Sequence, residues 1–182
     1  RISSGVTNMN TFWRHGVYVG LCAKALAVRL GCLNTERLFV AGLLHDIGTL
    51  QINAKFPDAA EAMILNAEGD ESNIIEAERE SLGFDHAYLG GLMLENWNLP
   101  EATCDALRYH HNPRGAEVTA LEANILSASD TLANYSGTGS FSETVAEHDE
   151  LSPSISELLD LTADIDRDAL LAEVDQQFIE TI

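Results

Sequence analysis

The amino-acid sequence predicts an all-α fold. Apolar side chains recur at spacings of three and four residues in several segments, which is the period of one face of an α-helix. No segment alternates apolar and polar residues as a half-buried strand would, and the chain contains no internal repeat. At 182 residues the chain is long enough for one domain with a substantial core.

Two helices are predicted in the first quarter of the chain. The first spans residues 11–30 and is followed by Gly31, a residue type that commonly ends helices. The second covers residues 34–46, with Asn or Thr as its N-cap, and Gly48 is expected to end it.

The next segments are more polar. A connection containing Pro57 leads to two acidic, weakly periodic helices over residues 58–67 and 71–81, which we expect at the periphery of the molecule. Asp85 is a suitable N-cap for a helix over residues 86–97, whose apolar residues form one stripe.

Two further helices complete the predicted core. Pro100 opens a helix that ends at His110-His111, and residues 121–135 form the next helix with Asp130 embedded among apolar residues.

The segments suggest a division of the chain into three parts. Residues 1–136 form the helical core, residues 137–154 form a linker or long loop, and residues 155–182 contain an acidic amphipathic helix packed on the core. Because the chain starts at Arg1 without an initiator Met, we expect that an N-terminal part of the parent protein is missing.

Composition restricts the classes of partner. Asp and Glu number 29 against 10 Lys and Arg, which gives a net charge of −19. A surface with this charge repels phosphate backbones and anionic lipids, so nucleic-acid and membrane binding are disfavoured, and any site for an anionic substrate depends on a local cation. No apolar run reaches membrane-spanning length. Three cysteines without a CxxC motif fit a reducing cytoplasm.

Several individual residues are predicted to have packing roles. We expect Trp13 and Trp97 to be core or helix-packing residues, and Cys22 and Cys104 to be small core side chains. The pair Gly90-Gly91 inside a predicted helix indicates a close helix crossing rather than a hinge.

Five of the six histidines and two aspartates stand at or near helix ends or first turns within the apolar part of the chain. These residues are His15, His45, Asp46, His86, His110, His111 and Asp130. Burying an imidazole and a carboxylate costs free energy unless they are paired, and a divalent metal ion removes that cost because it binds both groups well. The alternative to a metal site is structural: His45 would be a core histidine hydrogen-bonded to the neighbouring Asp46, or the pair would cap the C-terminus of a helix.

The ordered set of His, His-Asp, His, His-His and Asp on consecutive helices resembles the HD-domain superfamily and, more closely, the HDOD family (HD-related output domains). The residues that carry the resemblance lie at 12–15, 41–48, 86–100, 106–113 and 127–130. The resemblance covers most of the chain and implies a helical bundle of the HD-domain type.

The related HD-GYP family hydrolyses cyclic di-GMP with two or three metal ions, and all seven residues match its ligands. By this resemblance, Asp46 would bridge two metals and act as the catalytic bridging ligand of an active enzyme. One metal would also bind His15, His45 and Asp130, and the other His86, His110 and His111. Such a ligand set suits two divalent transition-metal ions, of iron, manganese, nickel or zinc, which activate water for attack on phosphorus.

Three departures from active HD-GYP relatives lie near these ligands. Thr49 replaces a Lys that grips phosphate, Thr11 replaces a Glu that some relatives use for a third metal, and no Gly-Tyr-Pro loop follows His111. The nearby candidates for substrate binding are then Arg14, Thr49, Arg108 and Arg114.

Two functional hypotheses follow. In the first, the chain is a cytoplasmic bacterial signal-transduction output or regulatory domain of HDOD type, which retains a di-metal site and acts through protein partners or a small phosphorylated ligand. In the second, it is a metal-dependent phosphohydrolase or phosphodiesterase acting on a nucleotide or cyclic dinucleotide. A sensor in the missing N-terminal part is compatible with either. The sequence does not predict the oligomeric state.

Overall fold

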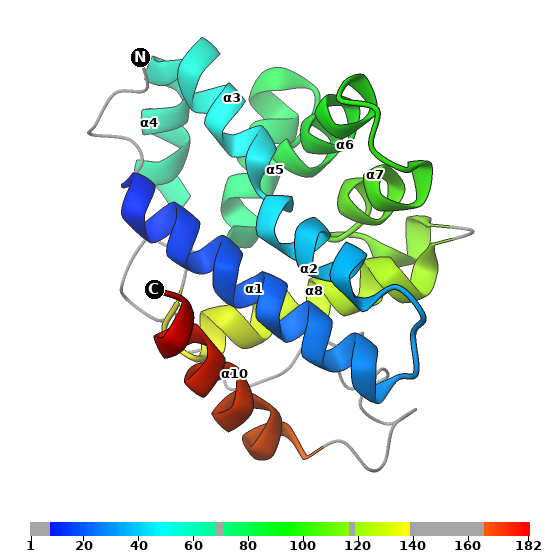
Figure 1. The fold of residues 1–182 in the computed structure, drawn as a ribbon. Coiled ribbons are helices and arrows are strands. Elements are labelled where there is room, and N and C mark those ends of the chain that lie inside the picture. The colour runs from blue at the N-terminus through cyan, green and yellow to red at the C-terminus, as the bar shows by residue number, and fades with distance from the viewer. Residues whose placement is uncertain (1–7, 68–70, 117–118, 139–165) are drawn as a thin grey trace.

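The computed structural model describes residues 8–67, 71–116, 119–138 and 166–182. Every regular element in these ranges is a helix (Figure 1), so the predicted all-α class is confirmed. The elements are α1 (Met9–Arg29), α2 (Thr35–Leu44), α3 (Ile47–Lys55), α4 (Pro57–Ala67), α5 (Glu71–Leu82), α6 (His86–Asn96), α7 (Glu101–Arg108), the short 3₁₀ helix η1 (Pro113–Gly115), α8 (Ala120–Tyr135) and α10 (Arg167–Thr181). None of the described helices has the length and apolar character needed to cross a membrane.

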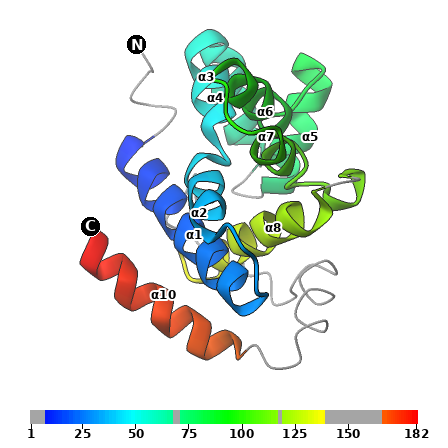
Figure 2. The same ribbon diagram turned by 45° about the vertical axis from the view of Figure 1, so that its right-hand side comes forward.

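Helices α1, α2, α8 and α10 form one packing group, visible in the lower part of Figures 1 and 2. Its core contains fully buried residues of α1 and α8, among them Leu26, Leu126 and Leu132. Helix α10 lies along α1 and adds Leu170 and Val174 to the same core. The predicted linker over residues 137–154 falls almost entirely outside the described residues.

Helices α3 to α7 form the second group, drawn in the upper part of Figure 1. Leu94 of α6 and Leu107 of α7 are fully buried at its centre, and Ile52 of α3 packs with α4. Asp85 caps α6 as expected, since its carboxylate accepts a 2.8 Å hydrogen bond from the Tyr88 backbone N–H.

The chain between the two groups differs from the prediction. Gly48 does not end a helix, because α2 stops at Leu44 and α3 has already begun at Ile47; residues 50–55 are helical too. A Cβ on Gly48 would lie 2.1 Å from the main-chain oxygen of His86. The glycine therefore allows α3 to cross α6 at very short range.

The glycine pair and the cysteines behave as predicted. A Cβ on Gly90 would lie 2.8 Å from Leu107 Cδ2, and one on Gly91 would lie 3.0 Å from the carbonyl oxygen of Cys104, which confirms a close helix crossing. Cys22 and Cys104 are both fully buried.

The tryptophan prediction is wrong. Trp13 is 39 % exposed and Trp97 is 49 % exposed. On α1 the inward positions are those of Phe12 and His15, so the intervening Trp13 points outward and meets Phe12 edge-on at a ring distance of 5.2 Å. Trp97 follows the last residue of α6 and lies beyond the packed part of that helix.

Candidate metal centre

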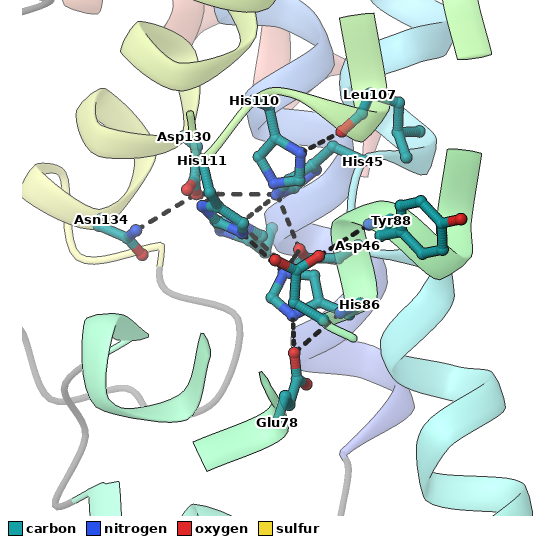
Figure 3. A network of polar contacts seen from close by, with 12 residues as sticks. His45, Asp46, Glu78, His86, Tyr88, Leu107, His110, His111, Asp130 and Asn134 are labelled. Atoms are coloured by element: carbon teal, nitrogen blue, oxygen red, sulfur yellow. Dashed lines mark hydrogen bonds and ion pairs between the residues drawn. The ribbon is translucent and has the colours of Figure 1, made fainter. Parts of the chain in front are cut away.

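The structure brings all seven predicted ligand residues together where the two helix groups meet. Figure 3 labels all of them except His15. They come from α1 (His15), the turn between α2 and α3 (His45 and Asp46), the first position of α6 (His86), the turn after α7 (His110 and His111) and α8 (Asp130). The turn places His45 and Asp46 side by side at the end of one helix and the start of the next. All except the half-buried His111 are buried.

The donor atoms form two clusters, in each of which the atoms lie within 4.8 Å of one another. The first cluster consists of His15, His45 and Asp130, and the second consists of Asp46, His86, His110 and His111. Asp46 lies next to both, because its Oδ1 is 3.3 Å from His45 Nε2 and 3.3 Å from His86 Nε2. Its Oδ2 is 4.0 Å from His15 Nε2.

The carboxylate of Asp130 completes the first cluster. Its Oδ1 lies 3.1 Å from His15 Nε2 and 3.7 Å from His45 Nε2, and it also accepts a 3.2 Å hydrogen bond from the Asn134 amide (Figure 3). The two imidazole Nε2 atoms of the cluster are 3.3 Å apart.

Four of the five imidazoles are held through their other nitrogen. The Nδ1–H donates from His15 to Thr138 O (2.5 Å), from His45 to Gly42 O (2.7 Å), from His86 to Glu78 Oε2 (2.7 Å) and from His110 to Leu107 O (2.6 Å). Carbonyl and carboxylate oxygens only accept, so Nδ1 carries the proton in each ring. Each Nε2 therefore faces the centre, where it can bind a metal ion once it is free of a proton, as metal-binding histidines require.

Three buried atoms at the centre make no hydrogen bond within the described part of the chain: both carboxylate oxygens of Asp46 and Nε2 of His110. Buried polar atoms are usually hydrogen-bonded, because burial without a partner costs free energy. The Nε2 atoms of His86 and His111 are 2.8 Å apart, so they either share a proton in a hydrogen bond or bind a common metal ion. The residues present fit a divalent metal ion in each cluster.

The electrostatics of the centre are strongly coupled. Burial disfavours a charged His45, but the carboxylates of Asp46 and Asp130 outweigh it and raise the pKa of His45 to about 9. Burial alone would raise the pKa of Asp46, but His45 and His86 lower it well below its usual range. Burial and the neighbouring His45 lower the pKa of His110 to about 4. At neutral pH the second cluster therefore contains an ionised Asp46 beside a neutral His110.

Sequence reasoning missed Glu78, which α5 places beside His86. The side chain is only 2 % exposed, and its Oε2 accepts hydrogen bonds from both the ring Nδ1 and the backbone N–H of His86. A signal was present, because Glu78 follows the buried Ile74 by four residues and so lies on the inward face of α5. We expected α5 to be peripheral, but this side chain makes it part of the centre.

The predicted substrate-binding residues stand in different settings. Thr49 is buried in the first turn of α3, whereas the guanidinium of Arg14 lies over the Phe178 ring at 5.3 Å. Arg108 pairs with Glu95 at 2.5 Å, and Arg114 is exposed on η1.

An open pocket of about 580 Å³ borders His111. Its lining residues are Ile75, Glu76, Arg79, Glu80 and His111. Arg79 is bound to Asp85 by two short contacts of 2.5 and 2.7 Å, so two exposed glutamates dominate the charge of this lining.

Comparison with known proteins agrees with this architecture. The family model for the HDOD domain matches residues 1–113. A solved HDOD domain protein of unknown function from Geobacter sulfurreducens is 27 % identical, with a TM-score of 0.72 over 95 % of this chain and 60 % of its own. A "Putative phosphohydrolase" from Shewanella amazonensis SB2B is 25 % identical, with a TM-score of 0.70 over 93 % of this chain and 60 % of its own.

A protein of Treponema pallidum (strain Nichols), described as uncharacterized, is 28 % identical over 104 residues, which are 55 % of this chain and 20 % of that relative. The chain therefore spans only part of the length of the proteins it matches. The family model covers more than half of the chain, including six of the seven ligand residues. This chain belongs to the HDOD domain family.

Proposed function

We propose that this chain is a signal-transduction output domain of HDOD type whose core holds two divalent transition-metal ions. The observation that carries the proposal is the set of seven converging donors, four of them with Nδ1 anchored so that Nε2 faces inward. In this function the ions fix the junction between the two helix groups, and a partner molecule binds the surface around that junction.

The chemistry of the donors selects the class of metal. Five imidazoles and two carboxylates form a nitrogen-rich set, whereas magnesium and calcium prefer sites built from oxygen. We therefore propose iron, manganese, nickel or zinc. Asp46 lies between the clusters and is suited to bridging the two ions.

A regulatory role is favoured over catalysis because the surroundings are poor in groups that grip phosphate. Thr49 carries no charge, Arg108 is neutralised by Glu95, and Arg14 lies over an aromatic ring. The pocket beside His111 presents two glutamates, which would repel an anion. We propose protein partners, or a small phosphorylated ligand, in the cytoplasm, and no nucleic acid or membrane, in line with the net charge of −19.

A metal-dependent phosphohydrolase is the second candidate. It is favoured by the complete ligand set and by the name of the similar Shewanella amazonensis protein. Metal ions bound here would supply Lewis acidity and an activated water. The role of the protein would be to hold the imidazoles and Asp46 in place, with Arg114 as an exposed cation close to His111 in the chain.

Elemental analysis of protein purified without chelator tests the proposal. We expect up to two transition-metal ions per chain, and we expect Asp46→Ala to lose them because its carboxylate belongs to the second cluster and lies beside the first. The matched control is Asp58→Ala, which removes an exposed carboxylate on α4. If the wild-type chain binds no metal after reconstitution with iron(II) or manganese under reducing conditions, the proposal is wrong.

An activity assay separates the two candidates. With manganese or iron(II) bound, we expect no efficient turnover of cyclic di-GMP and at most slow cleavage of an activated phosphodiester. The reason is the missing phosphate grip, since each lost electrostatic donor costs about 10²–10³ in rate. Efficient cyclic di-GMP hydrolysis that disappears in His45→Ala would establish the phosphohydrolase instead.

A further inference from the structure

Glu78 makes an unusual pair of contacts inside the centre. Its carboxylate comes from α5, which carries none of the seven ligands, and reaches His86 at the start of α6 (Figure 3). One oxygen, Oε2, accepts from the ring Nδ1–H at 2.7 Å and from the backbone N–H at 2.8 Å. The side chain is fixed by burial at 2 % exposure, so both contacts are shielded from water.

The other three anchored imidazoles have neutral partners. His15, His45 and His110 each donate to a main-chain carbonyl, of Thr138, Gly42 and Leu107 respectively. A carbonyl orients a ring but adds no net charge. A carboxylate orients the ring and also makes its free nitrogen a stronger donor, as in carboxylate–histidine–metal arrangements.

The distribution of negative charge adds to this difference. The first cluster contains its own carboxylate, Asp130, in addition to the nearby Asp46. The second cluster contains only Asp46, which it shares with the first. Glu78 is therefore the carboxylate, among the described residues, that gives the second cluster a negative charge of its own.

We infer that Glu78 is a positioning residue that makes the two metal positions unequal, strengthening the one formed by Asp46, His86, His110 and His111. The inference rests on the proposed metal-binding function. It assigns Glu78 a part in metal affinity that none of the matched motifs contains. In the bound state the carboxylate keeps His86 Nε2 directed at the second metal position, and its loss weakens that position selectively.

The test is a cobalt(II) titration of chelator-stripped protein, followed by visible absorption and by competition with a chelator of known affinity. The variant is Glu78→Gln, which keeps a carbonyl oxygen able to accept both hydrogen bonds and removes the charge. The control is Glu61→Gln, an equal change of charge at an exposed position on α4. Circular dichroism of the stripped proteins checks that both variants fold.

We expect the wild-type chain and Glu61→Gln to bind two equivalents with the same pair of affinities. In Glu78→Gln one equivalent keeps its affinity and the other weakens about 10- to 100-fold, the usual effect of losing a partner of a metal-bound histidine. Two equivalents with unchanged affinities, or an equal loss at both positions, would overturn the inference and leave the proposed function standing. No binding by the wild-type chain would overturn both.

A second measurement does not depend on the variant. In the zinc-loaded wild-type chain labelled with ¹⁵N-histidine, we expect nuclear magnetic resonance to show His86 protonated at Nδ1 and bound to zinc through Nε2. Coordination through Nδ1, or a proton on Nε2, contradicts the inference, because Glu78 then cannot hold the ring as an acceptor.

Discussion

At the scale of single residues, His45 combines two requirements that oppose each other. Its Nε2 must be free of protons to bind metal, yet Asp46 and Asp130 raise its pKa to about 9 against the effect of burial. In the metal-free protein at pH 7 this ring therefore carries a proton on Nε2 as well as on Nδ1, and metal binding has to displace the proton on Nε2.

This competition predicts a pH-dependent affinity. Metal affinity should rise with pH up to at least about 9, because His45 must lose a proton, and so must His86, whose pKa Glu78 and Asp46 raise well above its usual range despite burial. Calorimetric titrations with zinc at pH 7, in two buffers of different ionisation enthalpy, should reveal proton release on binding. Identical heats in the two buffers would show that no proton leaves. His110 should contribute little to the release, because its pKa of about 4 leaves it neutral already.

The ligands of the centre could be predicted from the sequence, but their supports could not. His15, His45 and Asp46 are chemically distinctive side chains in apolar helices, and their order along the chain carries the family resemblance. Their anchors are mostly main-chain carbonyls, which every residue possesses, so no residue type marks them. Glu78 has a side chain that could be recognised, but its partner His86 becomes apparent only when α5 packs beside α6.

At the scale of helices, the crossing of α3 and α6 sets the distance between Asp46 and His86. Asp46 immediately precedes α3 and His86 begins α6, while Gly48 lies at the point of contact. The sequence suggested a helix end at Gly48 because glycine often has that role. It could not reveal that the missing side chain serves a helix contact, since the contact is between segments far apart in sequence.

Gly48→Ala should accordingly be damaging. The added Cβ would meet the His86 main-chain oxygen at 2.1 Å, and main-chain atoms cannot move aside without shifting a helix. We expect a loss of unfolding free energy of about 1–3 kcal/mol, typical of overpacking, together with weaker metal binding. Urea denaturation and metal titration would measure the two effects. Lys55→Ala, at the exposed end of α3, is the control and should change neither.

Helix α10 is attached to α1 largely through its inward face. Phe178 is 6 % exposed, meets Tyr18 edge-on at a ring distance of 5.2 Å and lies under the guanidinium of Arg14. Phe178→Ala should lower the unfolding free energy by about 3–5 kcal/mol. The neighbouring Ile179 is 75 % exposed, so Ile179→Ala should change it by less than about 0.5 kcal/mol. Equal effects of the two variants in thermal denaturation would show that α10 is not docked by this face.

At the scale of the whole molecule, the metal centre ties two helix groups together. The first cluster draws on α1 and α8, and the second draws on α6 and the turn after α7, with the His45-Asp46 turn between them. The helical class, most helix positions and the ligand set could be read from periodicity and motif order. The sequence could not predict that Trp13 points outward, because hydrophobicity alone does not say which face of α1 the other helices cover.

Metal should therefore stabilise the entire domain. At a free concentration 100 times the Kd, binding to the folded state alone adds about 2.7 kcal/mol per site. For a domain of this length, each bound ion then raises Tm by about 5–10 °C. Differential scanning fluorimetry with zinc and with magnesium should show the rise for zinc, and Asp46→Ala should abolish it. An unchanged Tm for zinc-loaded wild-type protein would contradict a centre that joins the two groups.

The main-chain anchors also bear on how such a site changes during evolution. A carbonyl oxygen is present whatever codon stands at position 107 or 138, so no change of side chain there deletes an anchor while the helix ends keep their shape. The anchor of His86 is different, because one nucleotide change in the Glu78 codon can remove it. The second metal position can thus be weakened in one mutational step that leaves every ligand in place.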